Sequence, residues 1–464
     1  MTTRLVLSSF FFLEALVIYF ALTQGFPISG DDYSYTYQAK LFAAGKLYAE
    51  NPLYDRANPL NDCIAMSCTK DYHGHRFSAY PPGWPALLAI GAALGASWIV
   101  NPLLGALLVF FILWYVEQKL GKEFVPVTWL LLTLCLFFAY YAASTRAHIA
   151  TALFVFAAFL CYDAAERRSR HIGKWLFAAG ALLGYSSMIR YIDWIPLGAW
   201  IGISLLRRKN FSGLALFAVG FALLASGNLL YDALLSGNPF QAPTTINGTV
   251  GTNGRLVISW TGFRVTAVRL AYLLAVFPPV LLLGLFSRRY RPFARVTMYI
   301  ALFSMNVGIY FFYSASAGGP GPRYLLAYFP FLVLAVVDLY VWVEKESVPG
   351  ARYLWRASII CLLVGNVVFA TIEGYTLHGR RDLEREKELA GPGRKIFLLK
   401  TGTYRTITSD LTRNPPDLST SDNLYFNWCT QPKRDALLRL FPGRKVFVYA
   451  YPAHLYPYVP DRKL

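Results

Sequence analysis

Long apolar runs recur along this chain, and they constrain its fold more than any other feature. Runs of about 17–25 apolar residues are long enough to cross the hydrocarbon core of a bilayer. Because a backbone in lipid must satisfy its own hydrogen bonds, such runs fold as helices. The sequence therefore predicts an α-helical polytopic membrane protein with about eleven spans, at residues 5–25, 98–116, 124–143, 149–165, 174–190, 192–206, 211–231, 264–286, 296–313, 324–343 and 354–372.

The charged residues are few, and their placement predicts the orientation of the bundle. They make up 15% of the chain, against about 25% in soluble domains. Lys and Arg concentrate in alternate loops, which the positive-inside rule assigns to the cytoplasm together with the N-terminus. These loops lie at 119–122, 167–174, 207–209, 288–295 and 345–356. Anionic membrane lipids account for the net charge of +18, so no nucleic-acid partner is expected.

Two adjacent carboxylates, Asp31 and Asp32, follow the first apolar run. That run is interpreted as an anchor, because it lacks a clear signal-peptide cleavage site. The pair is then expected at the outward membrane surface. One aspartate suits the N-cap of a helix that begins there, but a cap leaves the second unexplained. Ionisable groups at this depth need a partner or a task, so the pair is the first candidate for a catalytic site.

The first outward loop, residues 26–97, is expected to hold interfacial helices at 31–48 and 84–96. The second segment is too short to span a bilayer comfortably, and Pro85 suits its first turn. A polar stretch lies between the two helices.

That polar stretch contains Cys63, Cys68, His73 and His75 in the spacing C-x4-C-x4-H-x-H. A zinc site is one interpretation, although the spacing is not that of a standard finger. In an oxidising compartment two nearby cysteines usually form a disulfide, so a Cys63–Cys68 bond is favoured.

Several basic side chains are predicted on the outward side. Arg146 and His148 lie in the turn between the third and fourth spans, and Arg190 closes the fifth. Arg323 follows a Gly/Pro-rich stretch and precedes the tenth span. Snorkelling to the interface is one explanation for each. An Arg at a helix end also suits a phosphate, because its planar guanidinium can donate two parallel hydrogen bonds.

The last part of the chain has a different pattern. Residues 1–379 form the predicted transmembrane domain, and 380–464 are expected to form a small outward α/β domain. Short strands are predicted at 395–399 and 445–449, with a helix at 433–441 between them.

Outward carboxylates and arginines on a helical bundle suit a lipid-phosphate donor. A carboxylate at the interface can remove the proton of an acceptor hydroxyl while the lipid phosphate leaves, which is general-base glycosyl transfer. The chain has no phosphate-binding glycine loop, Rossmann glycine pattern or nucleophile elbow. Nucleotide-sugar and ATP chemistry therefore gain no support.

Five stretches also carry a family resemblance, namely Asp31-Asp32-Tyr33-Ser34-Tyr35, Tyr80-Pro81-Pro82-Gly83-Trp84-Pro85, Asn101-Pro102-Leu103-Leu104-Gly105-Ala106-Leu107, Gly321-Pro322-Arg323-Tyr324, and residues 422–449 with Arg439-Leu440-Phe441-Pro442-Gly443-Arg444. Through them the chain resembles bacterial family-39-like GT-C glycosyltransferases, relatives of protein O-mannosyltransferases and lipid A aminoarabinose transferases. The resemblance implies an inverting transferase of the bacterial inner membrane. Such an enzyme moves a sugar from a polyprenyl-phosphate donor to a lipid, glycan or protein acceptor at the outer face. The resemblance also makes Asp31 the catalytic base, with Asp32 as its orienting neighbour.

The chain departs from that family pattern at two positions. Many relatives have a Lys just before the Tyr-Pro-Pro segment, where this chain has Ala79, and an Asp in the second outward loop, where it offers His148. Arg323, Arg190 and Arg76 are then the candidates for binding the donor phosphate. The sequence leaves open whether a divalent metal binds, and no cofactor is assigned. The alternatives are a flippase or transporter of lipid-linked glycans and a GT-C-fold polymerase or ligase; the outward acidic pair favours the transferase.

Overall fold

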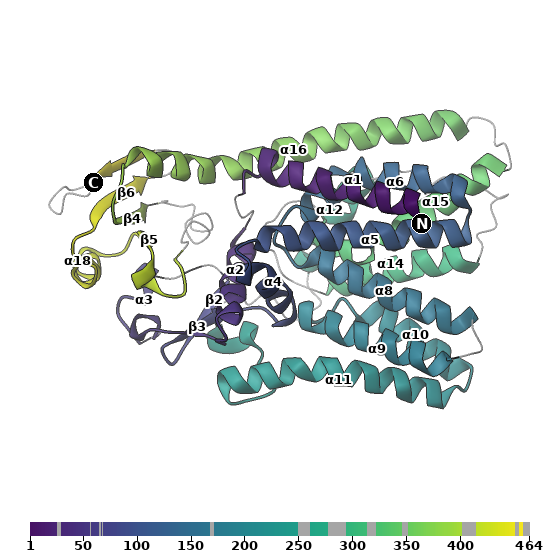
Figure 1. Ribbon diagram of the computed structural model, residues 1–464, viewed down its shortest axis with the longest axis horizontal. Coiled ribbons are helices and arrows are strands. Elements are labelled where there is room, and N and C mark those ends of the chain that lie inside the picture. The colour runs from purple at the N-terminus through teal and green to yellow at the C-terminus, as the bar shows by residue number, and fades with distance from the viewer. Residues whose placement is uncertain are drawn as a thin grey trace.

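The structure is a computed structural model of the 464-residue chain. It describes residues 1–25, 29–55, 57–64, 66, 68–167, 171–248, 260–276, 294–312, 322–345, 351–400, 414–450 and 454–457. The long helices run side by side as a bundle, and two small β-sheets lie beyond one end of it (Figure 1).

The helices of the bundle follow the predicted apolar runs. Their bounds are α1 Thr2–Val17 with the π-helical turn Ile18–Leu22, α5 Ser97–Lys119, α6 Val125–Thr133, α7 Leu136–Ala142, α8 His148–Arg167, α9 Ile172–Ile189, α10 Ile195–Arg207, α11 Phe211–Ser236, α12 Trp260–Val276, α14 Ala294–Phe311, α15 Phe329–Lys345 and α16 Ala351–Leu389. Short 3-10 turns lie at Pro52–Tyr54, Lys122–Phe124, Pro243–Gly248, Arg323–Tyr328 and Leu418–Thr420.

Each of the eleven predicted spans overlaps one of these helices over all or part of its length. Among the described residues, six helices are long and apolar enough to cross a membrane. A seventh span results if α6 and α7, which meet at a bend of 75°, count as one. The number eleven therefore stays a prediction.

The first loop is built from α2 (Gly30–Ala43), α3 (Asn61–Ile64), α4 (Gly83–Ala93) and a three-stranded antiparallel sheet. Its strands are β1 (Ala49–Glu50), β2 (Thr69–Tyr72) and β3 (His75–Ser78), in the order β1-β3-β2. The His73-Gly74 turn between β2 and β3 has positive φ at both residues, as a two-residue hairpin requires. Tyr35 and Ala39 of α2 pack with Trp84 and Leu88 of α4, and this contact fixes α2 over the end of the bundle.

The C-terminal sheet has the order β5-β4-β6-β7, with three parallel strands and an antiparallel edge strand. Its elements are β4 Lys395–Lys400, β5 Asn423–Asn427, α18 Gln431–Leu440, β6 Lys445–Ala450 and β7 His454–Pro457. β4, β6 and α18 match the predicted strands and helix. The predicted boundary at residue 380 lies inside α16, whose 39 residues extend about 58 Å and join the bundle to this sheet (Figure 1).

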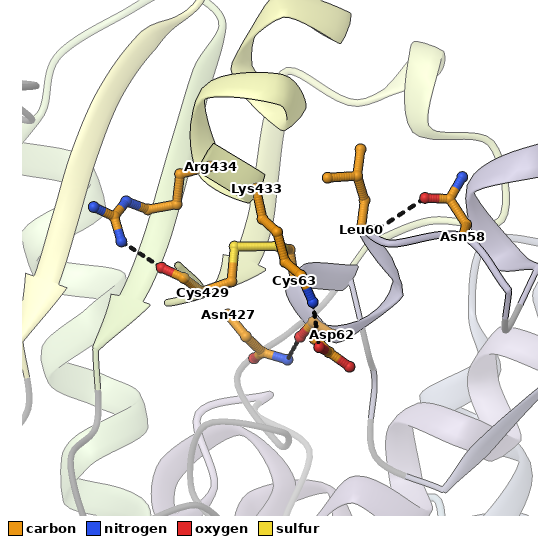
Figure 2. The surroundings of a disulfide bond; sticks show 8 residues. All are labelled: Asn58, Leu60, Asp62, Cys63, Asn427, Cys429, Lys433 and Arg434. Atoms are coloured by element: carbon orange, nitrogen blue, oxygen red, sulfur yellow. Dashed lines mark hydrogen bonds and ion pairs between the residues drawn. A yellow bond between two sulfur atoms is a disulfide. The ribbon is translucent and has the colours of Figure 1, made fainter. Parts of the chain in front are cut away.

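The predicted Cys63–Cys68 disulfide is wrong, because Cys63 is bonded to Cys429, which follows β5. Figure 2 shows this bond beside the Lys433–Asp62 ion pair, which also joins the C-terminal region to the first loop. Cys63 is buried in a core shared by the first loop and the C-terminal sheet. Cys68 directly precedes β2 and does not take part in a disulfide.

The zinc interpretation gains no support from the described part of the chain. There, no group of three or more His, Cys, Asp or Glu side chains is placed to hold a metal ion. The ring of His75 stacks on Tyr48 with a centroid distance of 3.8 Å, and His73 lies edge-on to Tyr72.

Candidate functional site

Asp32 is a structural carboxylate that joins α2 to the turn between α7 and α8. Its Oδ2 accepts hydrogen bonds from the backbone N and the hydroxyl of Ser29, which completes the capping box of α2. The same oxygen accepts from Nε of Arg146 at 3.2 Å. Oδ1 accepts from the backbone N and the hydroxyl of Thr145, at 3.1 and 2.8 Å. Both side chains of the Asp32–Arg146 pair are fully buried, and both oxygens of this carboxylate already accept hydrogen bonds from protein groups.

Asp31 faces a different environment, although it is the preceding residue. Its Oδ1 accepts from the hydroxyl of Tyr80 and, at 3.3 Å, from Sγ of Cys68. Its Oδ2 accepts from Nη1 of Arg323 at 3.2 Å. The Asp31 side chain keeps 19% of its surface exposed. It is therefore the accessible member of the acidic pair.

The partners of Asp31 keep its carboxylate charged. Burial by itself would raise the pKa of Asp31, but the guanidinium groups of Arg323 and Arg146 and the hydrogen bonds from Tyr80 and Cys68 outweigh it. The pKa is lowered from the ordinary value of an aspartate, so the group is ionised at neutral pH.

A second group of charges surrounds the ring of Tyr324, the residue after Arg323. The guanidinium carbons of Arg190, Arg269 and Arg323 lie 5.1, 4.3 and 5.0 Å from the ring centroid. Arg146 contacts the neighbouring ring of Tyr141 at 5.2 Å. The 3-10 turn Arg323–Tyr328 buries Arg323 at the start of α15, which brings it to Asp31. The four arginines are called the arginine cluster below.

The arginine cluster carries more positive charge than its carboxylates neutralise. Arg190 donates to Asp193 at 2.5 Å and to the hydroxyl of Tyr310 at 2.9 Å. Asp193, Asp31 and Asp32 thus face four arginines, which leaves an excess of one positive charge. Among the described residues, no acceptor reaches Nε of Arg323, Nη1 of Arg269 or Nη2 of Arg146, although all three atoms are buried. Buried donors without acceptors are costly, so the cluster is suited to an anion.

Arg76, the third candidate for the donor phosphate, lies in a separate and satisfied environment. Its Nε and Nη2 donate to Asp71 at 2.6 and 2.9 Å, and Nη1 donates to the carbonyl of Ile64. Its guanidinium carbon lies 4.0 Å from the ring centroid of Tyr54. The structure therefore brings Asp31, Arg146, His148, Arg190 and Arg323 together and places Arg76 in the core of the first loop.

The sequence did not point to Arg269 as a site residue, and it predicted no contact of Tyr80 or Cys68 with Asp31. Arg269 lies in α12, and an arginine within a predicted apolar span is itself a signal of a functional site. No local pattern indicated that Cys68 and Tyr80 contact Asp31, because each reaches it only through the fold of the first loop.

A cavity of about 460 Å³, which Asp32 also lines, lies against another face of α2. Tyr33, Thr36, Tyr37 and Lys40 line it, together with Trp98 and residues 414–416. Asp31 is not among its lining residues. Residues 33, 36, 37 and 40 share a helix face that points away from residue 31, since each residue advances the helix by about 100°. This cavity is therefore separate from the Asp31 site.

Comparison with known proteins gives a match only in three dimensions. No family model matches the chain, and no curated protein does. A crystal structure of ArnT from Cupriavidus metallidurans in the apo state matches with a TM-score of 0.59 and 14% identity, over 96% of this chain and 92% of that one. This chain has the GT-C fold. The same ArnT bound to undecaprenyl phosphate matches with a TM-score of 0.58 and 13% identity, over 96% and 93% of the two chains.

The match confirms the predicted GT-C architecture. The six described helices that are long and apolar enough to cross a membrane agree with the predicted integral membrane protein. At this level of identity the likeness concerns the fold. The chemistry of this chain rests on its own side chains.

Proposed function

We propose that the protein is an inverting glycosyltransferase that moves a sugar from a polyprenyl-phosphate donor to a hydroxyl group of a lipid, glycan or protein acceptor. The observation that carries the proposal is the ion pair between Asp31, an accessible carboxylate, and Arg323, which belongs to a cluster with unpaired buried donors. ArnT, which shares the fold, has been solved bound to undecaprenyl phosphate. The reaction is placed at the outer face of a bacterial inner membrane.

In this mechanism Asp31 removes the proton of the acceptor hydroxyl. The acceptor oxygen bonds to the anomeric carbon, and the bond from that carbon to the phosphate oxygen breaks on the opposite side. The bonding electrons go to the polyprenyl phosphate, and its charge is stabilised by the arginine cluster. Asp32 holds the N-terminus of α2 and so positions Asp31.

Arg323 connects Asp31, the proposed base, with the arginine cluster, where the donor phosphate is proposed to bind. It now donates to Asp31, and its Nε has no acceptor among the described residues. A donor phosphate near Arg323 competes for the guanidinium and weakens its effect on Asp31. The pKa of Asp31 then rises, so that the carboxylate becomes a stronger base only when the donor is bound.

The test is a transfer assay with purified protein and a polyprenyl-phosphate sugar. Asp31→Asn should lower kcat by about 100- to 10,000-fold, the usual contribution of a general base, while undecaprenyl phosphate still binds. An active Asp31→Asn protein would contradict the assignment of the base.

The phosphate site is tested by titrating undecaprenyl phosphate against lysine variants. Arg323→Lys keeps the charge but loses the two-pronged geometry, so binding should weaken by about 1–3 kcal/mol. Arg190→Lys should weaken it less, because Arg190 is already bound to Asp193. Arg76→Lys should not change it, since Arg76 is held by Asp71. If neither Arg323→Lys nor Arg190→Lys changes the affinity, the phosphate lies elsewhere.

A further inference from the structure

His148, the first residue of α8, lies inside the arginine cluster. Its side chain is buried between two aromatic rings, with centroid distances of 5.3 Å to Tyr141 and 6.1 Å to Tyr324. Its Nε2 lies 2.9 Å from Nη1 of Arg190. This contact decides which nitrogen of the ring carries the proton.

A guanidinium group has only donors, so the imidazole nitrogen that meets Arg190 must accept. The single proton of the neutral ring is therefore on Nδ1. A doubly protonated ring would direct an N–H at Arg190 and add a fifth positive charge to the cluster. His148 is accordingly a neutral side chain that presents an Nδ1–H donor.

The Nδ1–H donor of His148 has no hydrogen-bond partner in the described part of the protein. Nδ1 of His148 is buried, and no described residue supplies an acceptor for it. Unpaired buried donors on Arg146, Arg269 and Arg323 belong to residues that pack on the same two aromatic rings, Tyr141 and Tyr324.

We propose that Nδ1–H of His148 donates a hydrogen bond to an oxygen of the donor phosphate and that Arg190 fixes the tautomer that allows it. The inference rests on the proposed function, because the anion is taken to be the phosphodiester of the polyprenyl-phosphate sugar donor. A phosphodiester carries one negative charge, which matches the excess of one positive charge in the cluster. A carboxylate at position 148 would cancel that excess, whereas a neutral imidazole adds a hydrogen bond and leaves the charge unchanged.

Two amide substitutions separate this role from a structural one. In His148→Asn the amide nitrogen takes the place of Nδ1 and can donate to the phosphate, but the acceptor for Arg190 is lost. In His148→Gln the amide oxygen takes the place of Nε2 and can accept from Arg190, but the Nδ1 donor is lost.

The experiment titrates undecaprenyl phosphate against the full-length wild type and both variants in detergent micelles. We expect His148→Asn to bind within about threefold of the wild type. We expect His148→Gln to bind about tenfold more weakly or worse, the effect of losing one hydrogen bond to a charged group. The reverse order, or equal affinity in all three proteins, would overturn the inference. Failure of the wild type itself to bind would instead reject the polyprenyl-phosphate donor, and this inference with it.

A second measurement starts from the protein without ligand. The ¹⁵N spectrum of histidine-labelled protein, with the His148 signals assigned from their loss in His148→Asn, should show a protonated Nδ1 and an unprotonated Nε2. Addition of undecaprenyl phosphate should shift the Nδ1 signal. An Nε2–H tautomer would overturn the inference even if the lipid binds.

Discussion

Asp31 and Asp32 are neighbours in the sequence, yet they face opposite kinds of surroundings. Asp32 is fully buried and accepts from three residues near the start of α2 and the α7–α8 turn. Asp31 is partly exposed, and its partners are a tyrosine, a thiol and an arginine that belongs to the arginine cluster. Successive side chains on a helix diverge by about 100°, so two adjacent carboxylates need not share a function. Asp32 holds the start of α2 in place, and Asp31 keeps the exposure that the proposed base requires.

The largest effect on stability is expected from Asp32→Asn. Loss of this charge leaves Arg146 buried without its counter-charge, which costs about 3–5 kcal/mol. Thermal unfolding in detergent should show a clearly lowered Tm. Asp31→Asn is the matched control and should lower Tm less, because its side chain is partly exposed. Equal Tm values for the two variants would remove the distinction between the two carboxylates.

The two cysteines of the first loop should differ in a similar way. Cys63→Ser breaks the bond to Cys429, and a disulfide that closes a long loop contributes about 2–4 kcal/mol. We expect faster proteolysis of the C-terminal region after residue 390, measured by limited digestion. The same digestion pattern in wild type and Cys63→Ser would contradict this pairing.

Tyr80→Phe tests the basicity of Asp31. The lost hydrogen bond to a charged group is worth roughly 1.5–3 kcal/mol, and its removal raises the pKa of Asp31. The ionised carboxylate is the active form, so activity falls as pH drops through this pKa. The acidic limb of the kcat/KM profile should therefore move to higher pH in Tyr80→Phe. An unmoved limb would show that another group controls it.

The smallest effect is expected from Cys68→Ser. A thiol is a weak donor, and the serine hydroxyl can replace it at Oδ1 of Asp31. Transfer activity should change by about twofold or less. A large loss would indicate that the sulfur of Cys68 has a role beyond this contact.

Local patterns in the sequence predicted much of the fold. Long apolar runs located the helices of the bundle, and short continuous apolar runs located β4 and β6. The acidic pair at the end of the first apolar run pointed to α2, and the Gly/Pro-rich stretch before Arg323 pointed to the turn that leads into α15. These features depend on residues close together in the chain, where periodicity and turn residues decide the structure.

Contacts between distant segments were decided only by the tertiary structure. Cys63 pairs with Cys429 across 366 residues, and Arg323 reaches Asp31 across 292. Arg76 was a reasonable phosphate candidate until Asp71 on the neighbouring strand was seen to hold it. Residue type and spacing determined by themselves that the chain has a membrane bundle, an acidic pair and spare arginines. Which of these groups meet is set by the packing of whole helices and strands, because burial and partnership depend on surfaces that no short stretch of sequence contains.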